Sequence, residues 1–384
     1  MGTDVVFALF QTSWSGAVAR GLCMPEDRLA AALPGHPRVR RALVANPPRS
    51  AAAHWLRPAR TPFPGPALHE PLRLRRADPA YPGAARRDAE AYERSLRRAA
   101  RRLGLERPAI ITTHPVLAGF GDFGWAGPVT YYAWDDWTAS EPHRRWWPVY
   151  EQAFARLRAR GRAVCAVSDT VRDRIAPTGP VAVLPNGIDP EEWREPASAP
   201  AWFSGRPGPR MLYVGSLDRR VDVDQVRQLA ADYPSGSITL VGELLEPAHY
   251  EPLTALPNVE VHPRVPRREL TGLVAAADVC LIPHVQSPMT EAMSPLKLYE
   301  YLAGGRPVAA VALPGITGVS PRVALVRPGA DLAPAVQEAL AFGPADETER
   351  LRFIAENAWP RRFDGIVALA LDGAPLAGAR TAAG

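Results

Sequence analysis

Short apolar runs alternate with amphipathic stretches along most of the chain. Apolar runs of about four to eight residues are typical of buried strands in a parallel sheet, and apolar positions about three and four residues apart predict helices. Their alternation predicts βαβ units, and hence an α/β fold built on parallel sheets. In the first half we expect strands at residues 5–10, 42–44, 109–112, 129–132 and 163–167, with helices at 86–102 and 147–160.

The same alternation begins again after residue 209. The stretch before it, EPASAPAWFSGRPGP (195–209), has no periodicity and is rich in Pro, Ala, Ser and Gly, as interdomain linkers are. After it we expect strands at 211–214, 237–241, 259–262, 279–283 and 308–311, helices near 222–231, 267–276, 295–303 and 331–341, and a last helical stretch at 346–371.

These elements predict two doubly wound, Rossmann-like domains that face an interdomain cleft, with ligands at the carboxyl ends of the strands. The proline-rich stretch 58–82 predicts an extended arm over the first domain. We assign residues 1–195 to an N-terminal domain, 196–209 to a linker, 210–355 to a C-terminal domain, and 356–384 to a helix that crosses back and a flexible tail.

Composition predicts a soluble, globular protein. Hydrophobic residues make up 47% of the chain and charged residues 22%, both ordinary values. The start has no basic segment before an apolar run, and no apolar run is long enough to span a membrane, so we expect a cytoplasmic location. Cys23, Cys165 and Cys280 lack the spacing of a disulfide framework or zinc site, and the last two lie in apolar runs typical of buried thiols.

Charge is distributed unevenly along the chain. Residues 1–195 carry 28 arginines and 20 acidic residues, while residues 196–384 have a small acidic excess. The chain has one lysine, Lys297, among 45 basic residues. Arginine and lysine differ where a compact ammonium must meet a phosphate as a point charge, so Lys297 is a candidate site residue. The alternative is a surface lysine without a function.

Lys297 lies in the segment SPLKLYEYLAGGR, residues 294–306, which has the signals of a short helix. We expect Ser294 as its N-cap and Pro295 as its first residue, and two glycines end it. The helix start presents free N–H groups and a partial positive charge, which together bind phosphate. The diphosphate-binding candidates at this end are Ser294, Pro295, Leu296 and Lys297.

Glu300 follows Lys297 by three residues, on the same face of this helix. A carboxylate beside a phosphate site is expected where it accepts hydrogen bonds from ribose hydroxyls. A diphosphate at the helix start with a ribose against Glu300 describes a nucleoside diphosphate. The alternative is an N-capped helix with a Lys–Glu pair on its surface.

The segment SPLKLYEYLAGGRPV resembles the donor-binding helix of bacterial family-4 (group 1) nucleotide-sugar glycosyltransferases of the GT-B fold. In that family the glutamate matching Glu300 holds the ribose. VCAVSDTVRDRI and VAVLPNGIDPEEW, within 164–193, resemble the end of the family's first domain, and MLYVGSLDRRVDVDQV resembles the opening of its donor domain. The resemblance runs from about residue 110 to 312. It implies the GT-B fold, a nucleotide-sugar substrate, and neither cofactor nor metal.

The sequence departs from the family pattern in two places. The family often has a glutamate that contacts the donor sugar where this chain has Ala292. Either the loop is shifted so that the neighbouring Glu291, our catalytic candidate, takes this role, or a backbone contact replaces the carboxylate. The family's first donor-domain loop usually has an Arg after its glycine, but here Gly215 is followed by Ser216. We transfer the diphosphate role to Arg220 and, secondarily, to Arg219.

The first domain supplies further candidates. His114 follows a predicted strand, where the resemblance implies a catalytic-site contact with the donor sugar; a helix cap or loop histidine is the alternative. The adjacent pair Asp135 and Asp136 would suit a metal, but strand-end capping or contacts to acceptor hydroxyls fit the resemblance better. Trp14, Ser15, Gly16, Asp135 and Asp136 are the acceptor-side candidates.

Helix 86–102 places several arginines on one face. Such a face suits an anionic lipid or an acidic partner, so peripheral membrane contact through the basic N-terminal domain is one interpretation, and a solvated surface is the other. The modest basic excess and the absence of a known module disfavour nucleic acid as a partner. The face consists of Arg94, Arg97, Arg98 and Arg101.

Together these features predict a glycosyltransferase that moves a sugar from a nucleotide diphosphate, UDP in our expectation, to an acceptor hydroxyl. The resemblance implies retention at the anomeric carbon. The acceptor would be a small molecule, a glycan or a lipid-linked intermediate, in envelope-glycan or antibiotic (natural-product) biosynthesis. Two alternatives stay open: a nucleotide-sugar epimerase of the same fold, and a non-catalytic nucleotide-sugar-binding subunit.

Overall fold

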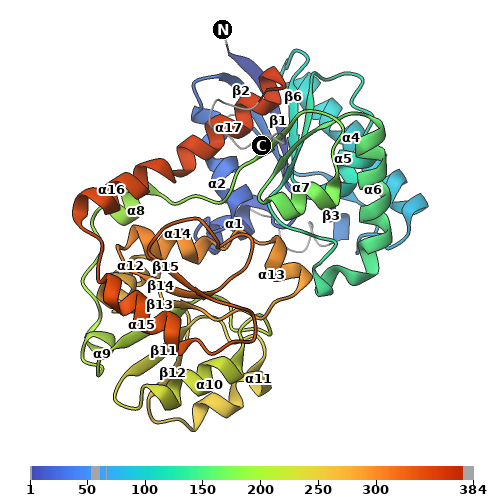
Figure 1. Cartoon of the computed structure of the whole chain (residues 1–384). Helices are drawn as coiled ribbons and strands as arrows, with labels where there is room; N and C mark the ends of the chain where they lie inside the picture. The colour runs from blue at the N-terminus through green and yellow to red at the C-terminus, as the bar shows by residue number, and fades with distance from the viewer. Residues whose placement is uncertain (1, 53–60, 66, 375–384) are drawn as a thin grey trace. The chain divides into compact units, whose positions relative to one another are not determined.

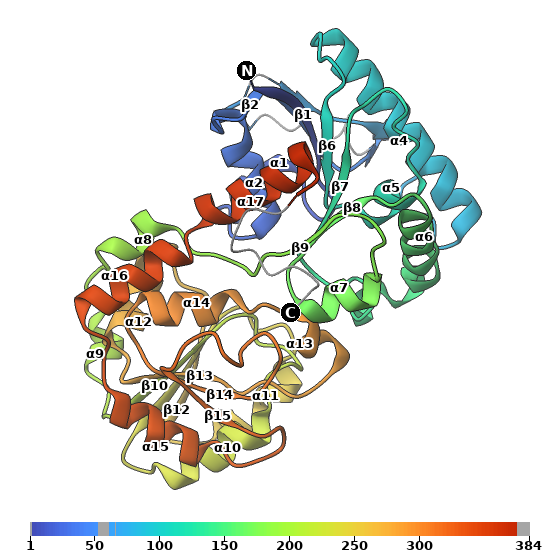
Figure 2. The ribbon, with the colours of Figure 1, turned by 45° about the horizontal axis from the view of Figure 1, so that its top comes forward.

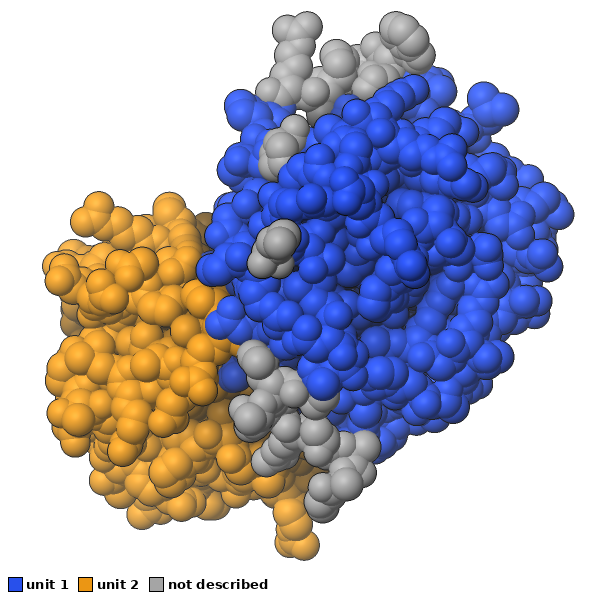
Figure 3. Space-filling view, turned by 90° about the horizontal axis from the view of Figure 1, so that it is seen from above, with its two compact units in different colours: residues 1–185, 362–384 blue, residues 186–361 orange. Residues whose placement is uncertain are grey.

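The computed structural model describes residues 2–52, 61–65 and 67–374 (Figure 1). The chain forms two compact units: unit 1 comprises Met1–Pro185 with Arg362–Gly384, and unit 2 comprises Asn186–Arg361 (Figure 3). The stretch 196–209, which we expected to be a linker, therefore lies inside unit 2, where it contains helix α9 (Ala201–Ser204). The expected tail 375–384 and part of the expected arm 58–82 lie outside the described residues.

Unit 1 is built on a parallel sheet with the strand order β4-β2-β1-β6-β7-β8-β9. Its strands are β1 (Thr3–Ala8), β2 (Val39–Ala45), β4 (Ala67–His69), β6 (Ala109–Thr112), β7 (Val129–Ala133), β8 (Ala163–Ala166) and β9 (Val181–Val183), with the short pair β3 (Arg49–Ser50) and β5 (Leu72–Arg73). Its helices are α1 (Trp14–Ala19), α2 (Pro25–Ala32), α4 (Pro82–Arg102), α5 (Pro115–Phe120), α6 (Trp147–Ala159) and α7 (Asp169–Ile175), and most of α17 (Trp359–Asp372) belongs to this unit.

Unit 2 repeats this plan with the parallel order β12-β11-β10-β13-β14-β15. Its strands are β10 (Arg210–Val214), β11 (Ser237–Val241), β12 (Val259–His262), β13 (Val279–Ile282), β14 (Val308–Val311) and β15 (Val323–Val326). Its helices include α8 (Pro190–Arg194), α10 (Val223–Asp232), α11 (Pro247–Thr254), α12 (Arg267–Ala276), α13 (Pro288–Ala292), α14 (Leu296–Ala303), α15 (Ala333–Phe342) and α16 (Glu347–Glu356).

Helices cover both faces of the unit 2 sheet (Figure 2). Side chains alternate between the faces of a strand. Leu212 and Val214 of β10 therefore join the core under α12, α14 and α16, whereas Met211 and Tyr213 join the core under α10, α11 and α15. Because both faces are buried, the strands show as the continuous apolar runs from which the sequence predicted them.

Most predicted elements are present, and the differences have physical causes. Strand 109–112 is confirmed as β6 and strand 237–241 as β11. The stretch 346–371 is two helices, because Ile188 exchanges backbone hydrogen bonds with Asn357 and Trp359 between them. Strands β9 and β15 were missed; both are short, and each begins with a half-buried residue. Cys165 and Cys280 are buried free thiols, as predicted.

One buried carboxylate joins three segments of unit 1. Glu26 of α2 is fully buried and accepts hydrogen bonds from the N–H groups of Phe10 (3.2 Å) and Gln11 (3.1 Å), just after β1. Thr113, just after β6, donates its hydroxyl to the same carboxylate at 2.5 Å. These bonds explain why the chain leaves the sheet at Ala8, two residues before the predicted end at Phe10. Burial raises the pKa of Glu26 to about 7, although the hydrogen bonds oppose the shift.

We predict that Glu26 makes the stability of unit 1 depend on pH. A carboxyl with a pKa of about 7 in the folded chain and 4.5 as reference favours folding at low pH, and this contribution is lost as pH rises between those values. The loss is about 3 kcal/mol. Denaturant unfolding of the wild type and of Glu26→Gln at several pH values in this range measures the loss of folding free energy. Only the wild type has the titrating carboxyl at position 26. A difference between the two proteins that does not change with pH would contradict the assignment.

Candidate functional site

The candidate donor-site residues of unit 2 lie near the point where its strand order reverses. β10 is the first strand along the chain, β11 lies on one side of it and β13 on the other, so the loops after β10 and β13 leave the sheet in opposite directions. Such a switch point is where open α/β sheets bind ligands. The loop Gly215–Arg220 follows β10, His284 follows β13, and α14 begins soon afterwards in the chain.

Lys297 is the centre of this cluster. Its Nζ lies 2.5 Å from the hydroxyl of Tyr213 and 3.3 Å from Nε2 of His284, and it stands 3.8 Å from the centre of the Tyr213 ring. Gly215 makes this approach feasible: a Cβ there would lie 2.6 Å from Nζ, and the glycine φ of 150° is one that other residues rarely adopt. The fold therefore holds the chain's single lysine against the end of β10.

The surroundings disfavour the charge on Lys297. Burial, and then the positive charge of Arg220, lower the pKa of Lys297 well below its usual range. Burial and the charge of Lys297 lower the pKa of His284 as well, so that histidine is neutral and its Nε2 can accept a hydrogen bond from the ammonium. A bound anion would favour the charged form of Lys297.

Two further arginines belong to the loop after β10. Arg220 is held by Asp218, with N···O distances of 2.6–3.0 Å, and also approaches the sulfur of Met293 at 3.7 Å. Arg219 is mostly exposed and lies 3.8 Å from a carboxylate oxygen of Glu246. The positive charge of Arg220 is close enough to lower the pKa of Lys297, whereas the side chain of Arg219 lies on the surface. Ser216, next to Gly215, accepts a hydrogen bond from the Tyr213 hydroxyl with its carbonyl.

The start of α14 differs by one residue from our expectation. Pro295 is the N-cap and Leu296 the first helical residue. Ser294 does not cap the helix: it accepts hydrogen bonds from the backbone and side-chain amides of Asn186, at 3.1 and 2.6 Å. Lys297 lies in the first turn, as predicted, and the helix ends at Gly304, followed by Gly305 in the left-handed region.

Glu300 pairs with an arginine from another helix. Its carboxylate lies 2.5 Å from Arg267 of α12, which also contacts Glu192 of α8 at 2.8 Å. The Lys–Glu surface pair that we kept as an alternative is therefore replaced by an Arg267–Glu300 pair. Glu300 remains 12% exposed and so can reach a ligand beside α14.

Glu291 lies in α13 and accepts a hydrogen bond from the amide of Gln286 at 2.7 Å. Ala292, at the position where the family often has a glutamate, is buried. Glu291 is partly exposed, and Gln286, the hydrogen-bond partner of its carboxylate, lies in the loop just before α13.

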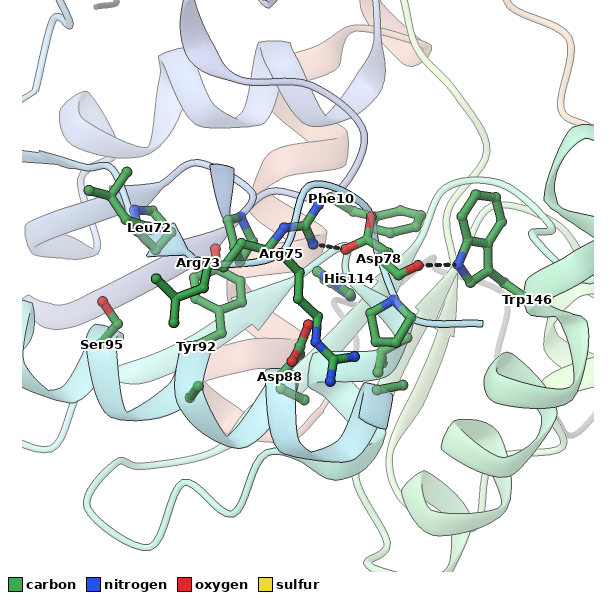
Figure 4. Close-up of a pocket in the computed structure, with 18 of the residues that line it drawn as sticks. Phe10, Leu72, Arg73, Arg75, Asp78, Asp88, Tyr92, Ser95, His114 and Trp146 are labelled. Atoms are coloured by element: carbon green, nitrogen blue, oxygen red, sulfur yellow. Dashed lines mark hydrogen bonds and ion pairs between the residues drawn. The ribbon is translucent and has the colours of Figure 1, made fainter. Parts of the chain in front are cut away.

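Unit 1 holds a pocket at its own switch point, between β1 and β6. The pocket has a volume of about 490 Å³ and is lined by residues from the ends of both strands, from the segment 71–79, and from α4 and α6 (Figure 4). Phe10, Tyr92 and Trp146 supply aromatic walls. Arg73 at the rim is paired with Asp78, whereas one carboxylate oxygen of Asp88 is buried without a hydrogen-bond partner.

His114 lines this pocket and caps α5. Its Nδ1 accepts a hydrogen bond from the N–H of Leu117 at 3.4 Å, which leaves the proton on Nε2. Burial lowers the pKa of His114 to about 4. At neutral pH the ring is therefore uncharged and can donate one hydrogen bond from Nε2, but it is a poor proton donor for general acid catalysis.

The acceptor-side candidates make structural contacts within unit 1. Trp14 is buried and donates its indole N–H to the carbonyl of Pro62, and Gly16 donates its N–H to Ser13 at the start of α1. The Ser15 hydroxyl lies 3.2 Å from that of Ser13. Asp135 accepts a hydrogen bond from the N–H of Asp136, whose own carboxylate pairs with Arg174 at 2.6 Å. None of these five residues lines the pocket.

Within the described residues, no three His, Cys, Asp or Glu side chains are grouped so that they could hold a metal ion. No helix of the described part of the chain is long and apolar enough to cross a bilayer.

Sequence reasoning missed several residues of both sites. Tyr213 and His284 contact Lys297 but were not among our candidates. Tyr213 lies inside a predicted apolar strand, and His284 follows one. The signal for His284 was present, since it is a polar residue directly after a strand beside the first strand. The pocket residues of 71–79 and of α4 carried no local signal, because only the fold brings them to the end of β1.

Comparison with known proteins identifies a family for each part of the chain. The family Glycosyltransferase Family 4 matches residues 33–192, and the family Glycosyl transferases group 1 matches residues 208–341. The putative teichuronic acid biosynthesis glycosyltransferase TuaH of Bacillus subtilis (strain 168) is 26% identical over 175 residues. That match covers 43% of this chain and 44% of TuaH, so it spans less than half of the relative's length.

Solved structures share the fold of the whole chain. Sucrose-phosphate synthase from Thermosynechococcus elongatus is 18% identical with a TM-score of 0.62, over 95% of this chain and 98% of its own. Anabaena HepE in complex with UDP and glucose is 17% identical with a TM-score of 0.58, over 96% and 99% of the two chains. The two family matches cover most of both units, and the chain therefore belongs to the family-4, group 1 glycosyltransferases of the GT-B fold.

Proposed function

We propose that the protein transfers a sugar from a nucleotide diphosphate sugar to an acceptor hydroxyl, with UDP as the nucleotide and retention at the anomeric carbon. The observation that carries the proposal is the switch point of unit 2, where Lys297, Arg220 and the start of α14 converge beside Gly215. Retention is inferred from the family alone.

The chemistry of this site fits the leaving group of such a reaction. When the bond between the anomeric carbon and the diphosphate oxygen breaks, negative charge collects on the diphosphate. Lys297, Arg220 and the first N–H groups of α14 are fixed before the reaction, and preorganised positive groups stabilise such charge without reorganisation. The acceptor oxygen forms the new bond to the sugar and its proton is released.

Glu300 supplies the ribose contact in this proposal. It lies one helical turn after Lys297, its side chain is 12% exposed, and its carboxylate is paired with Arg267. The orientation of Glu300 is therefore set before a nucleotide arrives. Glu291 and His114 remain our candidates for contacts with the donor sugar, Glu291 through its carboxylate and His114 through its Nε2–H.

The acceptor, we propose, binds in the pocket of unit 1. Aromatic walls and a carboxylate oxygen without a hydrogen-bond partner suit a sugar ring, which offers apolar faces to the aromatics and hydroxyls to Asp88. The relationship to TuaH supports an envelope glycan as the acceptor class. A cytoplasmic location and independence of metal ions are part of the same proposal.

We predict that the protein releases nucleotide from a labelled UDP-sugar, slowly by hydrolysis alone and faster with an acceptor, and that excess chelator leaves the rate unchanged. A panel of nucleotide sugars with different bases and sugars, followed by chromatography, measures this. A new sugar nucleotide without release would identify an epimerase, and binding without turnover a non-catalytic subunit. Activity lost in chelator and restored by magnesium would contradict metal independence.

We predict that Glu300→Gln weakens UDP binding by one to two decades, at about 1.4 kcal/mol per decade, because charge-assisted bonds to the ribose hydroxyls are lost. The mutant and the wild type should bind 2′,3′-dideoxy-UDP almost equally. Calorimetry with both ligands gives the comparison. Glu192→Gln is the matched control, since it removes the other carboxylate of Arg267 and should leave UDP affinity nearly unchanged. Equal weakening for both ligands would exclude the ribose contact.

A further inference from the structure

The segment that leads into α4 exposes large apolar side chains. Leu74 is 97% exposed, Tyr81 59% and Leu72 48%. Single exposed apolar residues are common on protein surfaces and need no explanation. Here three of them lie within ten consecutive residues, and Leu74 has almost no protein contact. Three exposed apolar side chains in one short segment make this surface a candidate contact site.

The same part of the chain is strongly basic. Residues 72–102 contain ten arginines and four acidic residues. Helix α4 packs most of its alanines, Tyr92 and Leu96 into unit 1 and turns its arginines to the surface. Within the described residues, Arg86 is the one exposed arginine of α4 with a carboxylate partner, Glu90. The exposed arginines of α4 are Arg86, Arg87, Arg94, Arg97, Arg98, Arg101 and Arg102.

Unit 2 offers an internal comparison. Leu244 and Leu245 are exposed to a similar degree, 41% and 52%. Their neighbours in the chain are acidic, Glu243 and Glu246, whereas Leu72 and Leu74 alternate with Arg73 and Arg75. An anionic surface would attract the basic segment that contains Leu72 and Leu74 in unit 1. It would repel the acidic segment that contains Leu244 and Leu245 in unit 2. Charge therefore distinguishes two otherwise similar apolar patches.

The basic apolar surface also borders the pocket of unit 1. Leu72, Leu74 and Arg75 are exposed and line that pocket at the same time, and α4 forms one of its walls through Asp88, Tyr92 and Ser95 (Figure 4). A body that covers this surface therefore lies at the rim of the pocket.

We propose that this surface docks unit 1 on an anionic lipid bilayer. We call it the basic rim: Leu72, Leu74 and Tyr81 with the exposed arginines of residues 75–76 and α4. The apolar face of α4 is buried in the core, so α4 contributes charge at the headgroups and does not insert. Leu74, with its neighbours Leu72 and Tyr81, enters the interface. Docking places the rim of the unit 1 pocket at the membrane, where a lipid-linked acceptor would be held.

Binding to vesicles tests the proposal with the full chain and needs no turnover. Flotation with phosphatidylcholine vesicles is compared with flotation when about 30% of the lipid is phosphatidylglycerol. We expect binding to the anionic vesicles only, weaker at about 0.5 M than at about 0.1 M salt because the charges are screened. Absence of binding, or equal binding to both lipids, would overturn the proposal and favour a solvated face or an acidic protein partner.

Variants locate the contact. Each basic residue near an anionic surface strengthens binding about fivefold, so replacing Arg94, Arg98 and Arg101 together by glutamine should weaken it at least tenfold. Leu74→Ser should weaken it several-fold without affecting the fold, since the side chain is exposed. The matched controls in unit 2 are Leu245→Ser and a triple glutamine variant of the exposed Arg227, Arg268 and Arg352.

The two control variants should bind vesicles like the wild type. If the unit 2 triple variant weakens binding as much as the unit 1 triple variant, net charge and not the basic rim is responsible, and the proposal is wrong. UDP affinity measured on the same proteins separates this outcome from a failure of the proposed function. Loss of vesicle binding with unchanged UDP affinity is the result that we expect for the rim variants.

Discussion

A single close approach organises the site of unit 2: the ammonium of Lys297 rests against the backbone at Gly215. Only a residue without a Cβ leaves room there, so the loop after β10 and the first turn of α14 constrain each other. Tyr213 and His284 offer hydrogen-bond partners without a full negative charge. The lysine is thus fixed in position, and an incoming phosphate would favour its charged form.

The switch points of the two sheets carry different polar groups. In unit 2 a cation is held at the switch point of the sheet, next to a helix start. In unit 1 a buried carboxylate, Glu26, accepts hydrogen bonds from the N–H groups of Phe10 and Gln11, which line the pocket, and from the hydroxyl of Thr113. One switch point therefore favours an anionic ligand. The other has aromatic walls, the carboxylate of Asp88 and the neutral ring of His114, the groups on which our acceptor proposal rests.

The sequence predicted the fold well because both sheets are parallel and buried on both faces, so that most strands are short continuous apolar runs. Lys297 and Glu300 were predicted from the signals of one short helix, and α14 lies within one residue of the expected helix. Ser294 was assigned as a cap from its type, but its hydroxyl pairs with Asn186, more than a hundred residues away in the chain. Likewise the Arg267–Glu300 pair and the walls of the unit 1 pocket depend on contacts between distant segments, which no local pattern encodes.

The most direct test of the account is the affinity of UDP for wild-type protein and for Lys297→Ala, measured by calorimetry. Arg227→Ala, an exposed arginine of α10 paired with Asp224, removes a positive charge of the same unit and serves as the control. We predict that Lys297→Ala weakens UDP binding by about 1.5–3 kcal/mol, the scale of a hydrogen bond to a charged group, and that the control variant binds UDP like the wild type. Equal affinity of the wild type and Lys297→Ala would contradict the central claim that this lysine meets the diphosphate.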